Sequence, residues 1–248
     1  MQSCFSATVG ILAHTLAALS ATIAGVRRFI ELSHPVHAGL VTYPGMPGPV
    51  ISDYLSREDA RGRYAPGTDF QIGRIDLIAN TGTYLDTPAH RFEGRGDLTD
   101  VPLERVADLP GVLVDATGVR AVDAALLERQ AGTYGDVTDC AVLVCTGWSK
   151  HFGKPAYGDP DAPFLTRDAV EWLVRSGPAL VGIDSVNIDD VADLTRPAHT
   201  GLLDAGIYVV EHLNDLDRLP VDGFRFTAVP PRIAGMGTFT VRAYAVLS

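Results

Sequence analysis

Short apolar runs recur along the chain, and they constrain its fold more than any other feature of the sequence. The runs are rich in Val, Ile and aromatic residues, and they fall at 72–78, 112–114, 141–145, 180–183, 207–210 and 224–229. The shorter runs are continuously apolar, which is typical of strands buried on both faces. A further run, 239–247, alternates between apolar and other residues, as a half-buried strand does. The sequence therefore predicts a sheet at the centre of the molecule.

Two helices accompany these strands. One is predicted over 122–130 and the other over 166–176, where Thr166 is the expected N-cap and Gly177 the expected stop. The stretch 34–68 is rich in turn residues and is predicted to be a loop. Strands and helices mix without strict alternation, so periodicity alone leaves α/β and α+β both open.

Composition excludes several classes of function. With 46% hydrophobic and 20% charged residues the chain has enough apolar material for a core. It carries 30 acidic against 20 basic residues, a net charge of -10, and has no run of Lys or Arg. A nucleic-acid or anionic-membrane surface needs a basic patch, so we expect neither partner.

The first 25 residues differ from the rest of the chain. Residues 9–24 are apolar and small, and no positive charge precedes them, which argues against a secretory signal and favours the cytoplasm. We interpret 1–25 as an N-terminal extension, either a loose helix or a start placed upstream of the true one. Residues 26–248 are then expected to form a single domain.

The first segment with informative chemistry is Asn80-Thr-Gly-Thr-Tyr84-Leu-Asp86-Thr-Pro-Ala-His90, which follows an apolar run. Its Gly and Pro residues predict a rigid loop that presents Asp86 and His90 above the sheet. An Asp and a His four residues apart suit a metal pair or an acid/base pair. Taken alone, the same pattern also fits a loop-capping Asp beside a surface His.

The second segment runs from His199 to Glu211. We expect His199 at the start of a short helix and Glu211 at the C-terminal end of a buried strand, where open α/β sheets place their ligands. A carboxylate there needs a cation unless it emerges into solvent. Asp184 follows another apolar run and is marked by the same argument. By contrast, Asp189 and Asp190 are predicted to form a solvated turn, and His212 to face away from Glu211.

These two segments, in this order, resemble the metal-dependent cyclase family, which includes bacterial kynurenine formamidases (arylformamidases) and isatin hydrolases. The family signature is His-x-Gly-Thr-His-x-Asp-x-Pro-x-His, followed downstream by a His and a Glu twelve residues later. The similarity extends through Leu32-Ser-His-Pro, Tyr43-Pro-Gly, Thr146-Gly-Trp148 and Gly182-Ile-Asp184-Ser. The resemblance implies an α/β fold of the swivelling β/β/α type, assembled as a homodimer or homotetramer.

The chain departs from the signature at two positions. Asn80 and Tyr84 stand where the family has the first two histidines, which together with the signature Asp hold one ion in the family. An amide and a phenol are poor replacements, because the phenol must lose its proton to bind a metal well. The resemblance leaves Asp86, His199 and Glu211 as ligands of a single Zn²⁺ or Mn²⁺ per chain. It makes His90 a proton shuttle or an additional ligand.

The function implied is hydrolysis of a small amide, lactam or ester. In this hypothesis His90 carries the proton of the attacking water, and Asn80 and Tyr84 donate hydrogen bonds to the oxyanion. Tyr43 and Trp148 are the candidates for an apolar substrate pocket, with Asp184 at a neighbouring strand end. Two alternatives remain open: a metal-independent lyase, dehydratase or cyclase that uses Tyr84 and His90, and a catalytically inactive ligand-binding protein.

Overall fold

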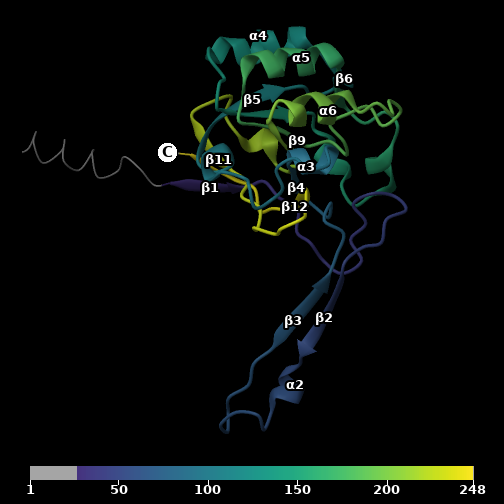
Figure 1. The fold of residues 1–248 in the computed structure, drawn as a ribbon, viewed down its shortest axis with the longest axis vertical. Helices are drawn as coiled ribbons and strands as arrows, with labels where there is room; N and C mark the ends of the chain where they lie inside the picture. Colours follow the sequence, from purple (N-terminus) through teal and green to yellow (C-terminus); the bar gives the residue numbers. More distant parts are fainter. Residues whose placement is uncertain (1–26, 248) are drawn as a thin grey trace, which may run out of the picture.

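Four parallel strands form the centre of the sheet in the computed structural model, which describes residues 27–247 (Figure 1). They are β5 (Leu109–Asp115), β7 (Ala141–Cys145), β9 (Leu180–Ile183) and β10 (Tyr208–Glu211), and they are neighbours in this order. All five residues of β7 and all four of β9 are buried, which is why these runs carry no polar alternation. The predicted segment 1–25 lies outside the described residues.

Antiparallel strands complete the sheet on both sides, in the order β1-β13-β11-β5-β7-β9-β10-β4-β12. One side holds β1 (Arg28–Glu31), β13 (Tyr244–Leu247) and β11 (Phe224–Thr227), and the other holds β4 (Tyr84–Asp86) and β12 (Thr238–Thr240). The predicted single strand 239–247 is therefore wrong. Its two halves, β12 and β13, pair at opposite sides of the sheet, which curls so that only residues 241–243 join them.

Helices α4 (Ala124–Tyr134), α5 (Arg167–Ser176) and α6 (Pro197–Asp204) cover one face of the sheet (Figure 1). Side chains of this face and of the helices form one apolar core. The opposite face forms a second core, which the curled strands and their loops enclose. Gly177 ends α5 in a left-handed conformation, as predicted. The prediction of an α/β fold is confirmed.

The remaining elements are short. They are α2 (Arg57–Ala60), α3 (Pro88–Arg91), the paired strands β6 (Ala121–Val122) and β8 (Phe164–Leu165), and the 3-10 turns η1 (Leu103–Arg105), η2 (Trp148–His151), η3 (Pro155–Gly158) and η4 (Leu216–Arg218). No helix within residues 27–247 has the length and apolar character that crossing a membrane requires.

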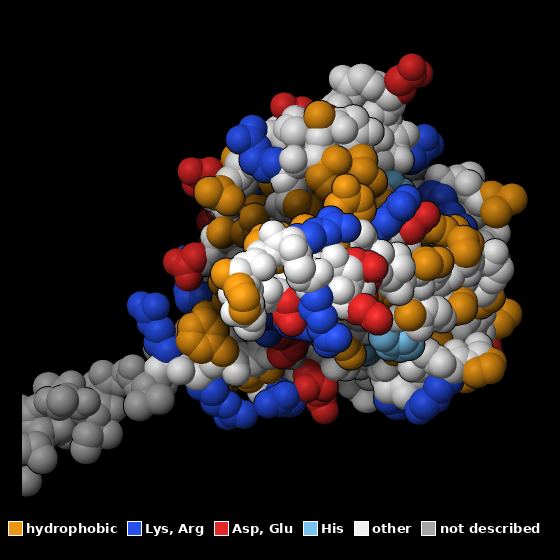
Figure 2. All heavy atoms as spheres, turned by 90° about the horizontal axis from the view of Figure 1, so that it is seen from below, with side chains coloured by type: hydrophobic (Ala, Val, Ile, Leu, Met, Phe, Trp, Pro, Cys, Tyr) orange, Lys and Arg blue, Asp and Glu red, His pale blue; other side chains and the backbone are white. Residues whose placement is uncertain are grey.

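A two-stranded hairpin, β2 (Val50–Leu55) with β3 (Ile72–Asp76), projects away from the sheet (Figure 1). The loop predicted over 34–68 is thus wrong, because it includes a strand and a helix. The strand at 72–76 exists, but every one of its residues is exposed. An isolated ribbon has no second layer to cover it, so its apolar side chains stay on the surface whichever face they occupy. Figure 2 looks at the molecule from the side of the hairpin tip.

Candidate metal centre

The register of β4 against β10 brings three polar side chains to one face of the sheet. Tyr84 lies opposite Glu211, and Asp86 lies opposite Val209. Because alternate residues of a strand share a face, Tyr84, Asp86 and Glu211 all face the layer of helices, where Val209 packs. Asp86 and Glu211 are completely buried. Glu211 therefore does not emerge into solvent.

His90 comes from α3, the single helical turn that follows Asp86. Pro88 occupies the first turn of α3, where a missing N–H is tolerated. The backbone N–H and the hydroxyl of Thr87 both donate to the carbonyl of Gly237, at 2.8 and 3.0 Å, and fix this turn against the segment that leads into β12. The rigid loop predicted over this segment is therefore wrong: Tyr84–Asp86 form β4 and Pro88–Arg91 form α3, and Thr87 between them is tied to a segment far along the chain.

His199 lies in the first turn of α6, as predicted, and is oriented by Asp189. The Asp189 carboxylate is 2.6 Å from Nδ1 of His199 and accepts the backbone N–H groups of Ala198 and His199 at 2.5 and 3.2 Å. Asp189 is 1% exposed, so the prediction of a solvated turn there is wrong. Its carboxylate holds Nδ1 and leaves Nε2 of His199 directed toward Asp86 and Glu211.

Asp86, His90 and His199 converge. One ligand atom from each lies within 4.8 Å of the others. Nε2 of His199 is 3.6 Å from one oxygen of Asp86, and Nδ1 of His90 is 3.7 Å from the other. Within residues 27–247 neither buried oxygen of Asp86 has a hydrogen-bond partner. Bonds of about 2.0–2.2 Å put two ligands of a tetrahedral ion roughly 3.4 Å apart, so this donor set fits a divalent cation.

The charges around His199 support the same conclusion. Burial alone would lower the pKa of His199, but Glu211, Asp189 and Asp86 together raise it well above its usual value. Three carboxylates around one imidazole therefore create a place that favours positive charge. A metal ion bound to His199 in place of the imidazole proton would supply the positive charge that these carboxylates favour.

Glu211 is held by groups other than the imidazoles. One oxygen accepts the backbone N–H of Ile188 at 2.5 Å, and the other accepts the hydroxyl of Tyr84 in a short hydrogen bond. Its first oxygen lies 3.8 Å from Nε2 of His199, at the margin of the cluster. Burial raises the pKa of Glu211 to about 7. Tyr84 commits its proton to this carboxylate, so its placement gives no support to the predicted role as an oxyanion donor.

Glu211 also ends a hydrogen-bonded chain of side chains. The hydroxyls of Tyr84 and Tyr43 are 2.5 Å apart, the Tyr43 hydroxyl is 3.1 Å from Nε2 of His212, and Nδ1 of His212 is 2.8 Å from the Tyr157 hydroxyl. Burial raises the pKa of each phenol well above 10 and lowers that of His212 to about 3. Tyr84 therefore stays protonated and makes no phenolate ligand.

A pocket of about 360 Å³ opens above this centre. Its lining includes predicted site residues together with others that the sequence did not mark: Tyr43, Met46, Asn80, Tyr84, His90, Arg91, Asn187, Arg196, His199 and Glu211. Trp148 is absent from this lining and packs one layer behind, where its indole N–H donates to the carbonyl of Tyr157 at 3.0 Å. It supports the pocket wall instead of contacting the pocket.

Asp184 is also absent from the lining. Its two oxygens accept the N–H and hydroxyl of Thr146 at 2.7 and 2.5 Å and the N–H of Gly147 at 2.9 Å. The carboxylate is buried and fully used in holding the turn after β7. We therefore correct the sequence interpretation: the placement of Asp184 favours a structural role over contact with substrate.

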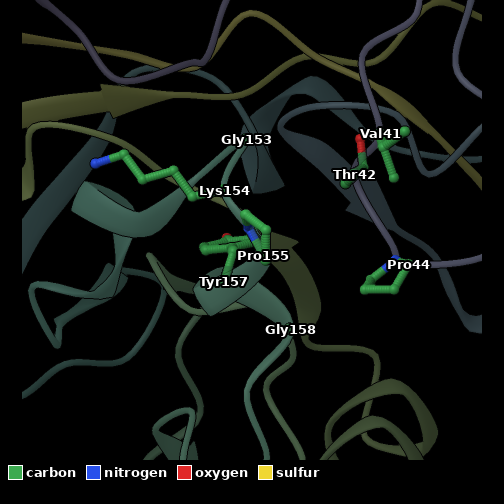
Figure 3. A pocket seen from close by; sticks show the side chains of 8 residues that line it. All are labelled: Val41, Thr42, Pro44, Gly153, Lys154, Pro155, Tyr157 and Gly158. Carbon is green, nitrogen blue, oxygen red and sulfur yellow. The ribbon is translucent and has the colours of Figure 1, made fainter.

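A second cavity, of about 410 Å³, lies between residues 41–44 and 153–158 (Figure 3). Tyr157 forms part of its wall, while Lys154 turns its ammonium group toward the carbonyl of Lys150, at 2.9 Å. The lining holds no carboxylate and no imidazole. Chemistry is therefore expected in the pocket above Asp86.

Two residues that contact the site were not identified from the sequence. Asp189 precedes His199 by ten residues, and no spacing rule connects an Asp in a loop with a later helix. His212 was expected to face away from Glu211, and within residues 27–247 it is no member of the Asp86 cluster. It leaves the strand with a φ of 57° and reaches the Tyr43 hydroxyl. A left-handed residue directly after a strand gives no signal in composition.

The chain is similar to known proteins over most of its length. The Cyclase family model, described as "Putative cyclase", matches residues 30–190. The kynurenine formamidase of Maricaulis maris is 27% identical over 217 residues, which cover 86% of this chain and 95% of that protein. The kynurenine formamidase of Salinibacter ruber is 30% identical over 174 residues, covering 69% and 78%.

Solved structures show the same fold. Isatin hydrolase A from Labrenzia aggregata superposes with a TM-score of 0.76 at 24% identity, over 94% of this chain and 99% of that one. Isatin hydrolase A from Ralstonia solanacearum gives a TM-score of 0.75 at 24% identity, over all of both chains. With the family model spanning more than half of its residues, this chain belongs to the cyclase family.

Proposed function

We propose that the protein is a metal-dependent hydrolase of small amides, including cyclic amides. The observation that carries the proposal is the buried Asp86 carboxylate, whose two oxygens lack partners among the described residues and face the imidazoles of His90 and His199. The relatives named for kynurenine formamidase and isatin hydrolase activity support this reaction class. Zn²⁺ and Mn²⁺ both suit one carboxylate and two imidazoles, and one ion per chain is proposed.

The geometry favours exchanging the roles of His90 and Glu211: His90 becomes a metal ligand and Glu211 the proton acceptor. Asp86, His90 and His199 would hold the ion, which when bound polarises a carbonyl and lowers the pKa of a water molecule. Glu211, fixed by Tyr84 and Ile188, is placed beside them to accept the proton of the attacking water. Asn80 lines the pocket and offers its amide N–H to the developing oxyanion.

Activity and chelation test the proposal together. Protein loaded with Zn²⁺ or Mn²⁺ is expected to hydrolyse formanilide or isatin, and exhaustive chelation is expected to remove this activity, which the metal then restores. Activity that survives chelation would point instead to acid/base chemistry by Tyr84 and His90. If substrates bind but are never hydrolysed with either metal, the protein is a binding member of the family.

Metal content separates the two assignments of roles. In Glu211→Gln we expect about one metal per chain, as in the parent, with turnover lowered about 100-fold or more, because the proton acceptor is lost. In His90→Ala we expect the metal to be lost as well. The measurement is elemental analysis of protein purified without added chelator. Loss of metal from Glu211→Gln with retention in His90→Ala would restore the sequence-based roles.

We also propose a cytoplasmic homo-oligomer, in which a second copy covers the projecting hairpin. Apolar side chains on β2 and β3 are unusually open to solvent, with Tyr54 76% exposed and Ile51 and Ile75 about half exposed. In Figure 2 such side chains lie among charged ones at the hairpin end of the molecule. Contiguous exposed apolar side chains are a feature of protein–protein interfaces, which supports a second copy at the hairpin.

Light scattering tests the assembly. The protein is expected at twice or four times the chain mass of 26.4 kDa, and the double variant Tyr54→Ser, Ile75→Ser at a lower multiple. Leu103→Ser, which changes an exposed leucine away from the hairpin, is the matched control and should keep the assembly. A monomeric parent would contradict the proposal.

A further inference from the structure

Two arginines stand at the rim of the pocket above Asp86. Arg91 and Arg196 are among its lining residues, whereas the other lining side chains are neutral or belong to the metal centre and its hydrogen-bond network. The chain as a whole carries a net charge of -10, so a cationic rim is not a consequence of composition. Each arginine is also close in sequence to an imidazole of the cluster: Arg91 follows His90 on α3, and Arg196, the residue before α6, precedes His199 by three residues.

Arg91 is held in place by contacts that do not pair its charge with a carboxylate of the described residues. Its Nε–H donates to the hydroxyl of Thr200 at 3.1 Å, and its guanidinium lies over the ring of Phe92, 5.3 Å from the centroid. The bond to Thr200 ties α3 to α6 and fixes the guanidinium relative to both imidazoles. Among residues 27–247 no carboxylate lies within 4.0 Å of it, whereas Arg95, four residues later, pairs with Asp204 at 3.2 Å.

Arg196 occupies a backbone position that a long cationic side chain rarely takes. It is the residue before α6 and has a φ of 50°, in the left-handed region that favours glycine. One terminal N–H donates to the carbonyl of Asp190 at 3.2 Å, which orients the half-buried side chain. Like Arg91, it has no carboxylate within 4.0 Å in the described part of the chain. Strain at an oriented, unpaired cation beside a pocket indicates a use in binding.

We propose that Arg91 and Arg196 bind a carboxylate of the substrate and so select amides that carry a carboxylate close to the scissile bond. This inference rests on the proposed amide hydrolysis. The planar fork of a guanidinium matches a carboxylate with two parallel hydrogen bonds, and a second fork from the neighbouring element fixes its orientation. With the carboxylate held at the rim, the amide lies toward Asp86, His90 and His199, which a pocket of about 360 Å³ accommodates.

A matched substrate pair tests the selection. The pair is 2-formamidobenzoate and formanilide, which differ only in the carboxylate. In Arg91→Gln and in Arg196→Gln, the ratio of kcat/KM for 2-formamidobenzoate to that for formanilide is expected to fall about 10- to 100-fold, mainly through KM. Arg91→Lys should lose part of this ratio, because it keeps the charge without the fork. Arg129→Gln, an exposed arginine on α4, is the control and should leave the ratio unchanged.

The outcomes separate this inference from the proposed function. A ratio unchanged in both variants, or an equal loss on both substrates, would overturn the carboxylate rim while leaving amide hydrolysis intact. If the parent hydrolyses neither of these substrates nor isatin, the proposed function fails, and calorimetric titration with benzoate then decides the rim alone. Benzoate binding weakened at least 10-fold in Arg91→Gln and Arg196→Gln supports the rim. Binding of equal strength in parent and variants rejects it, because the carboxylate is then held elsewhere.

Discussion

Replacing Asp86 with asparagine is expected to abolish metal binding and to lower turnover more than about 100-fold, without destabilising the metal-free protein. Outer groups that merely orient metal ligands cost about 10- to 100-fold when removed, and Asp86 is itself a proposed ligand. Its oxygens accept no hydrogen bond within residues 27–247, so the substitution breaks none. Elemental analysis, turnover and urea unfolding of the chelated protein measure the three effects.

Asp184→Asn is the matched control. Asp184 is equally buried, but its carboxylate accepts three hydrogen bonds from Thr146 and Gly147. An amide in its place presents an N–H to at least one of these donors, and we expect a loss of about 1–3 kcal/mol in the free energy of unfolding. Metal content should stay at the parent value. If Asp86→Asn destabilises the chelated protein as much as Asp184→Asn does, Asp86 has a structural role instead.

A single methyl group at Gly237 is expected to damage the centre from a distance. A Cβ there would lie 2.6 Å from the carbonyl carbon of Ala89 and closer still to the backbone nitrogen of His90. These are backbone atoms, so no side chain can rotate away, and α3 must shift with His90. We expect Gly237→Ala to cost about 1–3 kcal/mol of stability. A displacement of about 1 Å at the ligand lowers turnover about 100-fold.

Gly132→Ala provides the comparison for that variant. Gly132 lies in α4, where an added Cβ meets nothing within 4 Å. Alanine restricts the unfolded chain and favours the helix, so a gain of about 0.5–1 kcal/mol is expected with unchanged turnover. The measurements are urea unfolding and steady-state kinetics on both variants. Normal metal affinity and turnover in Gly237→Ala would show that the segment beside α3 yields freely.

The strands of the fold were predictable where burial on both faces removes every polar residue, as in β7 and β9. The region 239–247 misled because its alternation is real: Val241, Ala243 and Ala245 are all buried. Alternation reports which residues face the core, and it does not report which neighbour a strand pairs with. The connection 241–243 across the curled sheet points the same side chains inward as a continuous strand would. The alternation therefore predicted one strand where the structure has β12 and β13.

The prediction for the hairpin was wrong for a different reason, which concerns burial and not strand pairing. An apolar stretch at 72–78 indicates that something covers it, but the covering layer need not be in the same chain. Solvent exposes all of Ile72–Asp76 within this chain. Single-chain reasoning assigns every apolar run to its own core, and it therefore predicted a buried strand.

The candidate site was predictable through the resemblance to the family signature, because the residues alone also fitted a loop-capping Asp beside a surface His. Asp86, His90, His199 and Glu211 all meet near one pocket, although the sequence could not rank their roles. The role of Glu211 depends on two hydrogen bonds: one from Tyr84, which the register of β4 against β10 places, and one from Ile188, in the loop between β9 and α6. Asp189 was missed because no spacing rule links an Asp in a loop with a helix that begins eight residues later.

The chain of hydroxyls and imidazole that ends at Glu211 makes His212 a reporter of charge. While Glu211 is ionised it accepts from Tyr84, Tyr84 accepts from Tyr43, and Tyr43 accepts from the imidazole, whose proton then sits on Nε2. A proton added to Glu211 reverses every donor in turn, and the imidazole proton moves to Nδ1, facing Tyr157. The nitrogen NMR signals of the neutral, buried His212 ring therefore report the protonation state of the Glu211 carboxylate during a reaction cycle.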